Sequence, residues 1–256
     1  MLDRAVILRG DAWAARLQGH LSAAPNDIHE WMAEHTHRLK KEQHKISGLM
    51  RLGGDFCFLK FYGFRKPLAR HTLRFRTPPA LRAYDTAAAL RWKEVAVPRP
   101  RACLLIKRGI LLLSKGIEAS ETLHYLYGGG LNDDLASHIM WAAGDEIAQL
   151  HLAGYAHGNL RWNNLLWGRD RFYITHLEQA VRVQPQSSAH WRDLATFTVG
   201  AEEVGLDPWY YEQFLAAYMR RIEIDKEDLL ARLQGPLGRV RNKHWERYGS
   251  YPERLA

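Results

Sequence analysis

The sequence predicts an α+β protein with a strand-rich first part and a helical second part. Short apolar runs bounded by Gly and Pro mark the first part, and a long helical pattern follows at 132–152. With 46% hydrophobic and 11% aromatic residues over 256 positions, the chain is too apolar to be disordered. We expect a β-rich lobe with one main helix at 1–115 and a helical lobe at 116–256.

Local signals place the elements of the first lobe. The expected elements are an irregular extension at 1–35 with a helical stretch around 27–36, strands at 46–52 and 56–62, a helix at 80–92, and strands at 102–106 and 109–114. Gly53 and Gly54 lie between two strand-like runs, which is typical of a hairpin. Pro78 and Pro79 suit the first turn of the helix that follows, because proline is tolerated there.

The second lobe is predicted from helical periodicity. The expected elements are a helix at 132–152, a loop at 153–164, a hairpin from 165–168 and 172–177, and helices at 190–204, 208–222 and 226–234. Leu135, Ile139, Ala143 and Ile147 recur on one side of the first helix, as in an amphipathic helix.

The positive charge is concentrated in one segment. Of the net charge of +8, residues 37–82 carry +10, from twelve Lys or Arg against Glu42 and Asp55. This imbalance suggests a partner that bears phosphates, such as an anionic membrane surface, a phosphorylated glycolipid or nucleic acid. The alternative is a solvated basic face that only aids solubility.

Other features favour a soluble, cytoplasmic protein. No apolar run approaches the roughly 18 residues that a membrane helix needs, and the first residues lack a signal-peptide pattern. Cys57 and Cys103 lie in apolar strand-like runs, so we expect buried thiols and no disulfide.

The segment 150–181 carries the most chemical information. A long helix leads to a polar loop with His157, Asn159 and Asn164, and a hairpin then brings back His176. This arrangement resembles the catalytic core of protein-kinase-like phosphotransferases. More narrowly, residues 151–160 (HLAGYAHGNL) resemble the leader H-x-A-G-x-x-H-G-D-L of the lipopolysaccharide core kinase family (WaaP/InaA type).

The resemblance implies a two-lobed, protein-kinase-like fold with a catalytic-type loop at 153–178. It implies ATP as phosphate donor, Mg²⁺, and an inner-core sugar hydroxyl as acceptor at the inner face of the inner membrane. The lipopolysaccharide core glycolipid, or another phosphorylated ligand, would be the partner. By this resemblance, Lys60 would bind the nucleotide phosphates, Asn164 would supply an amide oxygen to the metal, and Arg161 would contact the transferring phosphate. His157 would organise the loop, and the carboxylate of Asp193 would support it.

Two positions depart from the family pattern. Asn159 stands where the family has the proton-accepting Asp, and an amide is not a general base. His176 replaces the metal-binding Asp, although Mg²⁺ prefers oxygen ligands. Glu178 would share a strand face with His176 and could supply a carboxylate about 6–7 Å along the strand. The helix at 80–92 offers Asp85 as a possible partner of Lys60, and a glycine-rich phosphate loop of the usual form is missing.

Simpler interpretations remain open for several residues. Lys60 could be an edge-strand lysine, His176 a core histidine, and the two asparagines loop caps. Three functions follow. The first is an impaired or atypical sugar kinase, and the second is a pseudokinase that binds nucleotide or glycolipid and supports another enzyme. The third is a basic protein that binds nucleic acid, which has only charge in its support.

Overall fold

The computed structural model describes residues 5–22, 27–42, 44–65, 77–249 and 253–256. Contacts divide the chain into two compact units, one formed by Met1–Arg91 with Pro98–Glu118 and the other by Trp92–Val97 with Ala119–Ala256. The expected boundary at 115/116 lies three residues before this one, and the short segment 92–97 groups with the second unit. Four cations of the basic segment (Lys66, Arg70, Arg74 and Arg76) lie outside the described residues.

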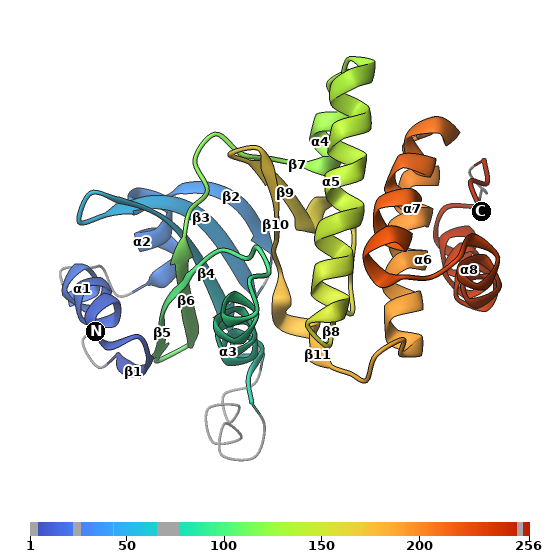
Figure 1. Ribbon diagram of the computed structural model, residues 1–256. Coiled ribbons are helices and arrows are strands. Elements are labelled where there is room, and N and C mark those ends of the chain that lie inside the picture. The colour runs from blue at the N-terminus through green and yellow to red at the C-terminus, as the bar shows by residue number, and fades with distance from the viewer. Residues whose placement is uncertain (1–4, 23–26, 43, 66–76, 250–252) are drawn as a thin grey trace. The chain divides into compact units, whose positions relative to one another are not determined.

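The first unit is built on an antiparallel sheet with the order β1-β5-β6-β4-β3-β2 (Figure 1). Its strands are β1 (Val6–Arg9), β2 (His37–Glu42), β3 (Lys45–Leu52), β4 (Asp55–Gly63), β5 (Pro100–Ile106) and β6 (Gly109–Lys115). Both expected hairpins form, β3 with β4 and β5 with β6. Gly53 and Gly54 have φ values of 59° and 85° between β3 and β4, a left-handed conformation that glycine adopts readily.

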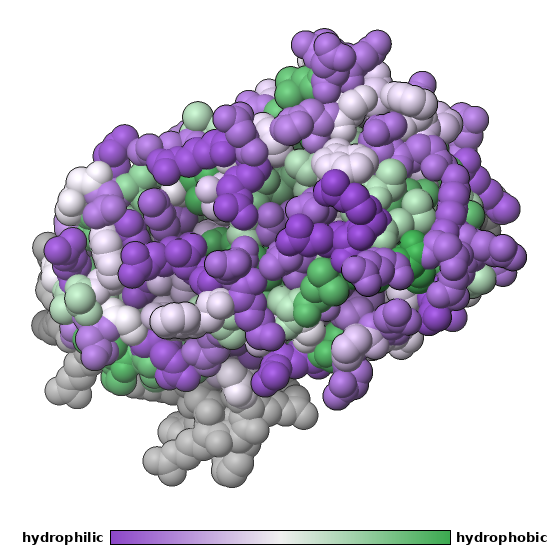
Figure 2. All heavy atoms as spheres, viewed as in Figure 1, coloured by the Kyte–Doolittle hydropathy of each residue, from purple (hydrophilic) through white to green (hydrophobic). Residues whose placement is uncertain are grey.

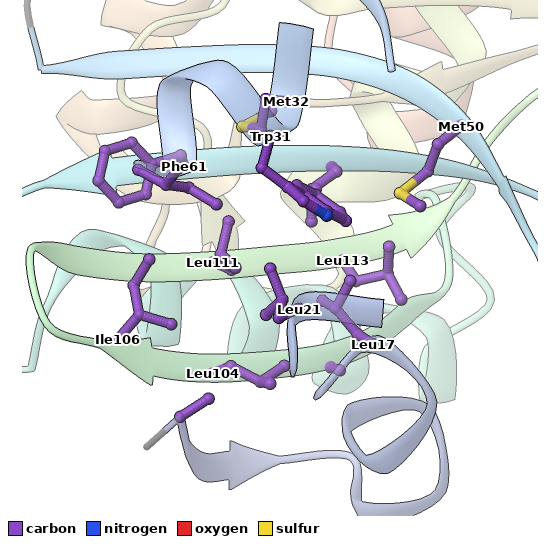
Figure 3. Close-up of a cluster of buried hydrophobic side chains, with 14 of the residues drawn as sticks. Leu17, Leu21, Trp31, Met32, Met50, Phe61, Leu104, Ile106, Leu111 and Leu113 are labelled. Carbon is purple, nitrogen blue, oxygen red and sulfur yellow. The ribbon is translucent and has the colours of Figure 1, made fainter. Parts of the chain in front are cut away.

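Helices α1 (Asp11–Ser22) and α2 (Ile28–His35) supply side chains to the main core of this unit. Leu17 and Leu21 of α1 and Trp31 of α2 pack with side chains from one face of the sheet, as Figure 3 shows. The sheet residues in this core alternate along each strand, because neighbouring side chains point to opposite faces. We call this side the core face.

Helix α3 (Pro79–Trp92) meets the opposite face of the sheet. Cys103 lies between two core-face residues of β5, Ala102 and Leu104, and its Sγ is 3.7 Å from the Ala80 carbonyl oxygen of α3. We call this side the α3 face. Cys57 and Cys103 are both buried and free, as expected.

The prediction of an irregular extension at 1–35 was wrong where β1 and α1 form, whereas the helical stretch expected around 27–36 is confirmed as α2. Ala14, Leu17 and Leu21 recur at helical spacing and are fully buried, so α1 is a regular helix that covers the sheet. The sequence pattern is short and interrupted by polar residues, and the helix finds its apolar partners in the sheet and in α2, elsewhere in the chain. Strand β2 was also missed, because an exposed, basic edge strand lacks apolar alternation.

The second unit is mainly helical. Its helices are α4 (Leu123–Gly128), α5 (Asp133–Leu152), α6 (Ser188–Glu203), α7 (Pro208–Ile222) and α8 (Lys226–Tyr248). Its short strands are β7 (Glu121–Thr122), β8 (Tyr155–Ala156), β9 (Leu165–Gly168), β10 (Arg171–Ile174) and β11 (Val181–Arg182), in the sheets β10-β9-β7 and β11-β8. Gly144 lets α5 approach α7 closely, since an added Cβ would lie 2.3 Å from the Phe214 carbonyl oxygen.

The segment 92–97 is held within the second unit by hydrogen bonds. The Ala96 N–H donates to Glu146 Oε1 at 2.6 Å, and the Ile174 N–H donates to the Ala96 carbonyl at 2.8 Å. Burial of the Glu146 carboxyl raises its pKa. We call residues 92–97 the strap.

Helix α8 continues well beyond the expected end at 234, through Pro236 to Tyr248. A proline inside a helix removes one backbone hydrogen bond. Here Pro236 and Leu237 are buried, and Arg241 in the second half of the helix forms an ion pair with the buried Glu202 of α6. These contacts explain why the helix persists. None of the described helices is long and apolar enough to cross a membrane. Hydrophilic residues cover much of the face drawn in Figure 2.

Candidate functional site

The loop that follows α5 is organised by one buried carboxylate. Asp193 of α6 is 2% exposed, and its two oxygens accept hydrogen bonds from consecutive backbone N–H groups of the loop. Oδ2 accepts from His157, and Oδ1 accepts from Gly158 at 2.9 Å. Gly158 has a φ of 77°, and an added Cβ would lie 2.7 Å from the Gln179 carbonyl oxygen. Glycine is therefore required at this turn.

Both ring nitrogens of His157 are engaged in hydrogen bonds. The Asn159 N–H donates to Nδ1 at 3.2 Å, so the proton sits on Nε2, which donates to the Thr175 carbonyl at 2.8 Å. Burial lowers the pKa of this imidazole, so the ring is neutral at neutral pH. A neutral ring with both nitrogens occupied suits a loop-organising role.

Asn159 and Asn164 close the loop on itself. The Asn159 carbonyl accepts from Asn164 Nδ2 at 2.8 Å and from the Arg161 N–H at 2.9 Å. The Asn164 carbonyl in turn accepts from the Thr175 N–H at 2.9 Å and from its hydroxyl at 3.0 Å. Because Nδ2 of Asn164 is directed at the backbone, Oδ1 is the atom of that side chain that can meet a cation.

Arg161 lies between these asparagines with an exposed side chain. Its backbone is fixed at both ends, since its N–H donates to the Asn159 carbonyl and its own carbonyl accepts from the Asn164 N–H at 2.8 Å. A fixed backbone and an exposed guanidinium allow this residue to meet an anionic ligand at the loop.

His176 and Glu178 do not share a strand, and this corrects the sequence prediction. The strand β10 ends at Ile174, and His176 has φ 62° and ψ 45°, a left-handed conformation that caps the short 3₁₀ turn Leu177–Gln179. The turn brings His176 Nδ1 to 3.8 Å from Glu178 Oε1. The separation expected for a strand therefore does not apply, and the two side chains lie next to each other.

The donor set of this loop does not fit a Mg²⁺ site of the kind that phosphotransferases use. No cluster of three or more His, Cys, Asp or Glu that could hold a metal is present among the residues the structure describes. Asn164 and Glu178 bear oxygen donors, while His176 offers a nitrogen. We therefore assign no catalytic step to a metal.

Lys60 lies in the first unit, on an inner strand of the sheet. Its strand β4 pairs with β3 on one side and β6 on the other, so the alternative of an edge-strand lysine is wrong. The residue is 7% exposed, and its Nζ lies 5.0 Å from the centroid of the Tyr62 ring. Ser47 and Leu112 are its direct cross-strand neighbours.

The sequence offered Asp85 as a possible partner of Lys60, and the structure pairs Asp85 with Arg9 instead. Arg9 Nε and Nη2 donate to the two carboxylate oxygens of Asp85 at 2.9 and 3.1 Å. Arg9 belongs to β1, three strands away from the strand of Lys60, or about 14 Å at the usual strand spacing. The ion pair raises the pKa of the Arg9 guanidinium through the hydrogen bond to Asp85.

Sequence reasoning missed a second layer of buried polar residues behind the loop. His151 Nδ1 lies 2.8 Å from the Tyr218 hydroxyl, His151 Nε2 lies 3.6 Å from Asp193 Oδ2, and its ring stacks on His190 at 4.2 Å between centroids. Burial lowers the pKa of His190 to about 4. His151 was visible in the loop leader, but its partners are 39, 42 and 67 residues away.

The fold of the chain is shared with a solved structure. No family model matches the chain, and no curated protein does. Among solved structures, WaaP in complex with acyl carrier protein matches with a TM-score of 0.64 and 16% identity, over 96% of this chain and 99% of that one. The match confirms the expected α+β fold, which this chain shares with WaaP. An antiparallel sheet forms the N-terminal part and helices form most of the C-terminal part.

Proposed function

We propose that this chain acts in lipopolysaccharide core biosynthesis as a kinase-like protein in which phosphoryl transfer is impaired. Its ligands are ATP and a core glycolipid that bears phosphates, and it works at the inner face of the inner membrane. The observation that carries the proposal is the ordered loop on Asp193, together with a fold that matches WaaP.

The roles of the chain's own residues follow from charge and position. Lys60 contacts the nucleotide phosphates, and Arg161 neutralises charge on the phosphate group. His157 and Asp193 hold the loop in shape. Asn159 occupies the position of the proton acceptor, yet its amide cannot take up the proton of the acceptor hydroxyl near neutral pH. Loss of general-base catalysis costs about 10²- to 10⁴-fold in rate.

The test is incorporation of phosphate from ATP into core oligosaccharide. We expect a slow reaction by the wild type, abolished in Lys60→Ala. In Asn159→Asp with His176→Asp, the rate should rise, because two carboxylates are restored at the positions where the family has them. An inactive wild type that also stays inactive in the double variant would overturn the kinase activity.

A second candidate is a pseudokinase, favoured by the absence of an acidic metal cluster among the described residues. It predicts that ATP stabilises the protein against heat without Mg²⁺ and that no phosphate is transferred. Stabilisation that requires Mg²⁺ would contradict it. Retention of nucleic acid that weakens with salt would instead support the third hypothesis.

Acyl carrier protein is a candidate partner, because the matched structure contains WaaP together with that protein. The net charge of +8 on this chain suits an acidic partner. Co-purification from a strain that overproduces acyl carrier protein, compared at 50 and 300 mM salt (about 14 and 6 Å of Debye length), tests the pairing.

A further inference from the structure

Trp92, the last residue of α3 and the first of the strap, is 90% exposed. The backbone that carries it is held in place. The Lys93 carbonyl accepts a hydrogen bond from Gln149 Nε2 of α5 at 3.2 Å, and the strap is tied to Glu146 through the Ala96 N–H. A single exposed apolar residue is ordinary on a protein surface, so the residues around Trp92 decide what it signifies.

Two further exposed apolar side chains lie at the C-terminal end of α5. Leu152, the last residue of α5, is 55% exposed and follows Gln149 by three positions, so the two side chains share one side of the helix. Val181 of β11 is 49% exposed, and β11 pairs with β8, which begins shortly after Leu152. Figure 1 shows β8 and β11 at this end of α5. Because Gln149 also contacts the strap, Trp92 belongs to the same end of the second unit.

Cations outnumber carboxylates around these side chains. Arg221 Nη2 of α7 donates to Gln149 Oε1 at 2.6 Å, so this guanidinium lies beside the contact between the strap and α5. Arg220 and Arg221 both pair with Asp145, one helical turn before Gln149. The charged residues at these positions are Lys93, Arg182, Arg220 and Arg221 against Glu94 and Asp145. This end of the second unit therefore attracts an anionic surface.

Trp209, a second exposed tryptophan of this unit, lies in contrasting surroundings. It is 65% exposed at the start of α7, and its N–H donates to Asp207 Oδ1 at 2.8 Å. The next residue, Tyr210, donates to Asp133 Oδ1 of α5 at 2.6 Å. Asp133 begins α5, about 24 Å from Gln149 at the rise of about 1.5 Å per residue. Since carboxylates surround it, Trp209 repels an anionic surface and provides a matched control.

A lipid surface suits exposed side chains of this kind better than a protein partner does. Protein interfaces bury their anchor residues in well-packed, desolvated pockets, within about 800 Å² per partner. A bilayer needs no matching pocket, and tryptophan settles at its headgroup level, where the ring meets apolar and the N–H meets polar surroundings. Neighbouring Lys and Arg side chains then meet the phosphates of anionic lipids.

We propose that this end of the second unit contacts an anionic membrane surface, with Trp92 and Leu152 entering the headgroup region of the bilayer. The inference deepens the proposed function and rests on it in one respect, the placement of the chain at the inner face of the inner membrane. It assigns that contact to named side chains, and it is independent of nucleotide binding and of phosphoryl transfer.

Sedimentation of the full chain with vesicles of phosphatidylglycerol and phosphatidylethanolamine tests the proposal. A salt concentration of about 0.3 M screens exposed charges beyond about 6 Å, so the apolar part of the binding is measured. We expect Trp92→Ala to weaken binding about tenfold and Leu152→Ser about threefold, because less apolar surface leaves water. Trp209→Ala should bind as the wild type does. Vesicles of phosphatidylcholine alone should bind more weakly than the anionic vesicles.

Quenching of tryptophan fluorescence by lipids brominated close to the headgroup reports insertion directly. Trp92→Phe should keep most of the binding and lose most of the quenching, because phenylalanine still enters the bilayer but tryptophan emission at this site is gone. Trp209→Phe should keep both the binding and the quenching. Equal quenching in Trp92→Phe and in the wild type would overturn the insertion of this side chain.

The outcomes separate this inference from the proposed function. If the wild type binds vesicles and Trp92→Ala binds as tightly as Trp209→Ala, the inference fails and the membrane placement stands. If the wild type does not bind anionic vesicles, the inference and the membrane placement both fail, and the phosphate-transfer test is unaffected. Loss of binding to acyl carrier protein in Trp92→Ala, with vesicle binding unchanged, would overturn the inference in favour of a protein interface. Circular dichroism of each variant confirms that the fold is intact.

Discussion

Replacing Asp193 with alanine should destabilise the second unit by about 2–4 kcal/mol. The variant removes the acceptor for two loop N–H groups, that of His157, which is fully buried, and that of Gly158, which is partly exposed. An unsatisfied buried N–H costs about 1–3 kcal/mol, and the exposed one costs less because water can reach it. The variant also removes the desolvation cost of a buried carboxylate, which offsets a small part of this loss.

Urea unfolding followed by tryptophan fluorescence measures the change, because Trp191 lies two residues from the substitution. Asp193→Asn should cost less than Asp193→Ala, since its remaining oxygen can still accept from one of the two N–H groups. Asp170→Asn is the control, an exposed aspartate in a left-handed turn where asparagine is tolerated, and should stay within about 0.5 kcal/mol of the wild type. Hydrogen exchange should speed up at the His157 amide. A loss below about 1 kcal/mol in Asp193→Ala, with unchanged exchange, would refute the assignment of this carboxylate as the support of the loop.

Three further predictions concern packing, pH and an ion pair. Gly144→Ala should destabilise the chain by about 1–3 kcal/mol, because its Cβ would collide with a carbonyl of α7. Gly238→Ala in α8, with open space around the added Cβ, should be neutral or stabilise the chain by up to about 1 kcal/mol, and thermal unfolding of both variants tests this. The pKa of His190 is lowered from 6.5 to about 4, so as the pH falls the unfolded state takes up a proton before the folded state does, and stability should be lost between about pH 6.5 and pH 4. His190→Phe should lose less stability over this range, and an unchanged dependence of stability on pH would contradict the assignment. A double-mutant cycle on Arg9 and Asp85 should give a coupling below about 1 kcal/mol, and Asp85→Ala should bind ATP as the wild type does; a weakened affinity would restore Asp85 to the nucleotide site.

The elements that the sequence predicted well are those set by local chemistry. The glycine pair at 53–54 fixes its own hairpin, and Asn132 caps α5 where the helical pattern begins. Elements that depend on a distant surface were missed. Helix α1 has a short apolar stripe whose meaning depends on the sheet, and β2 is a strand only because it pairs with β3.

The same distinction applies to the site. His157, Asn159 and Asn164 lie within eight residues, so their spacing alone suggested that they form one loop. The pairing of Asp85 with Arg9, which is 76 residues away, cannot be inferred from the local sequence around either residue. The turn at His176 was predicted as a strand because its apolar neighbours alternate, whereas its positive φ breaks the strand after Ile174.

The strap has a consequence for how the protein is made. Because residues 92–97 belong to the second unit, the chain passes from one unit to the other three times, after residues 91, 97 and 118. Neither unit is therefore one continuous stretch of the gene, and a fragment that starts at residue 119 would leave the carboxyl of Glu146 without the backbone donor of Ala96. During synthesis, Ala96 of the strap leaves the ribosome 50 residues before Glu146, so the hydrogen bond between them forms only after Glu146 has also emerged. A continuous fragment of the chain therefore either omits part of one unit or carries part of the other.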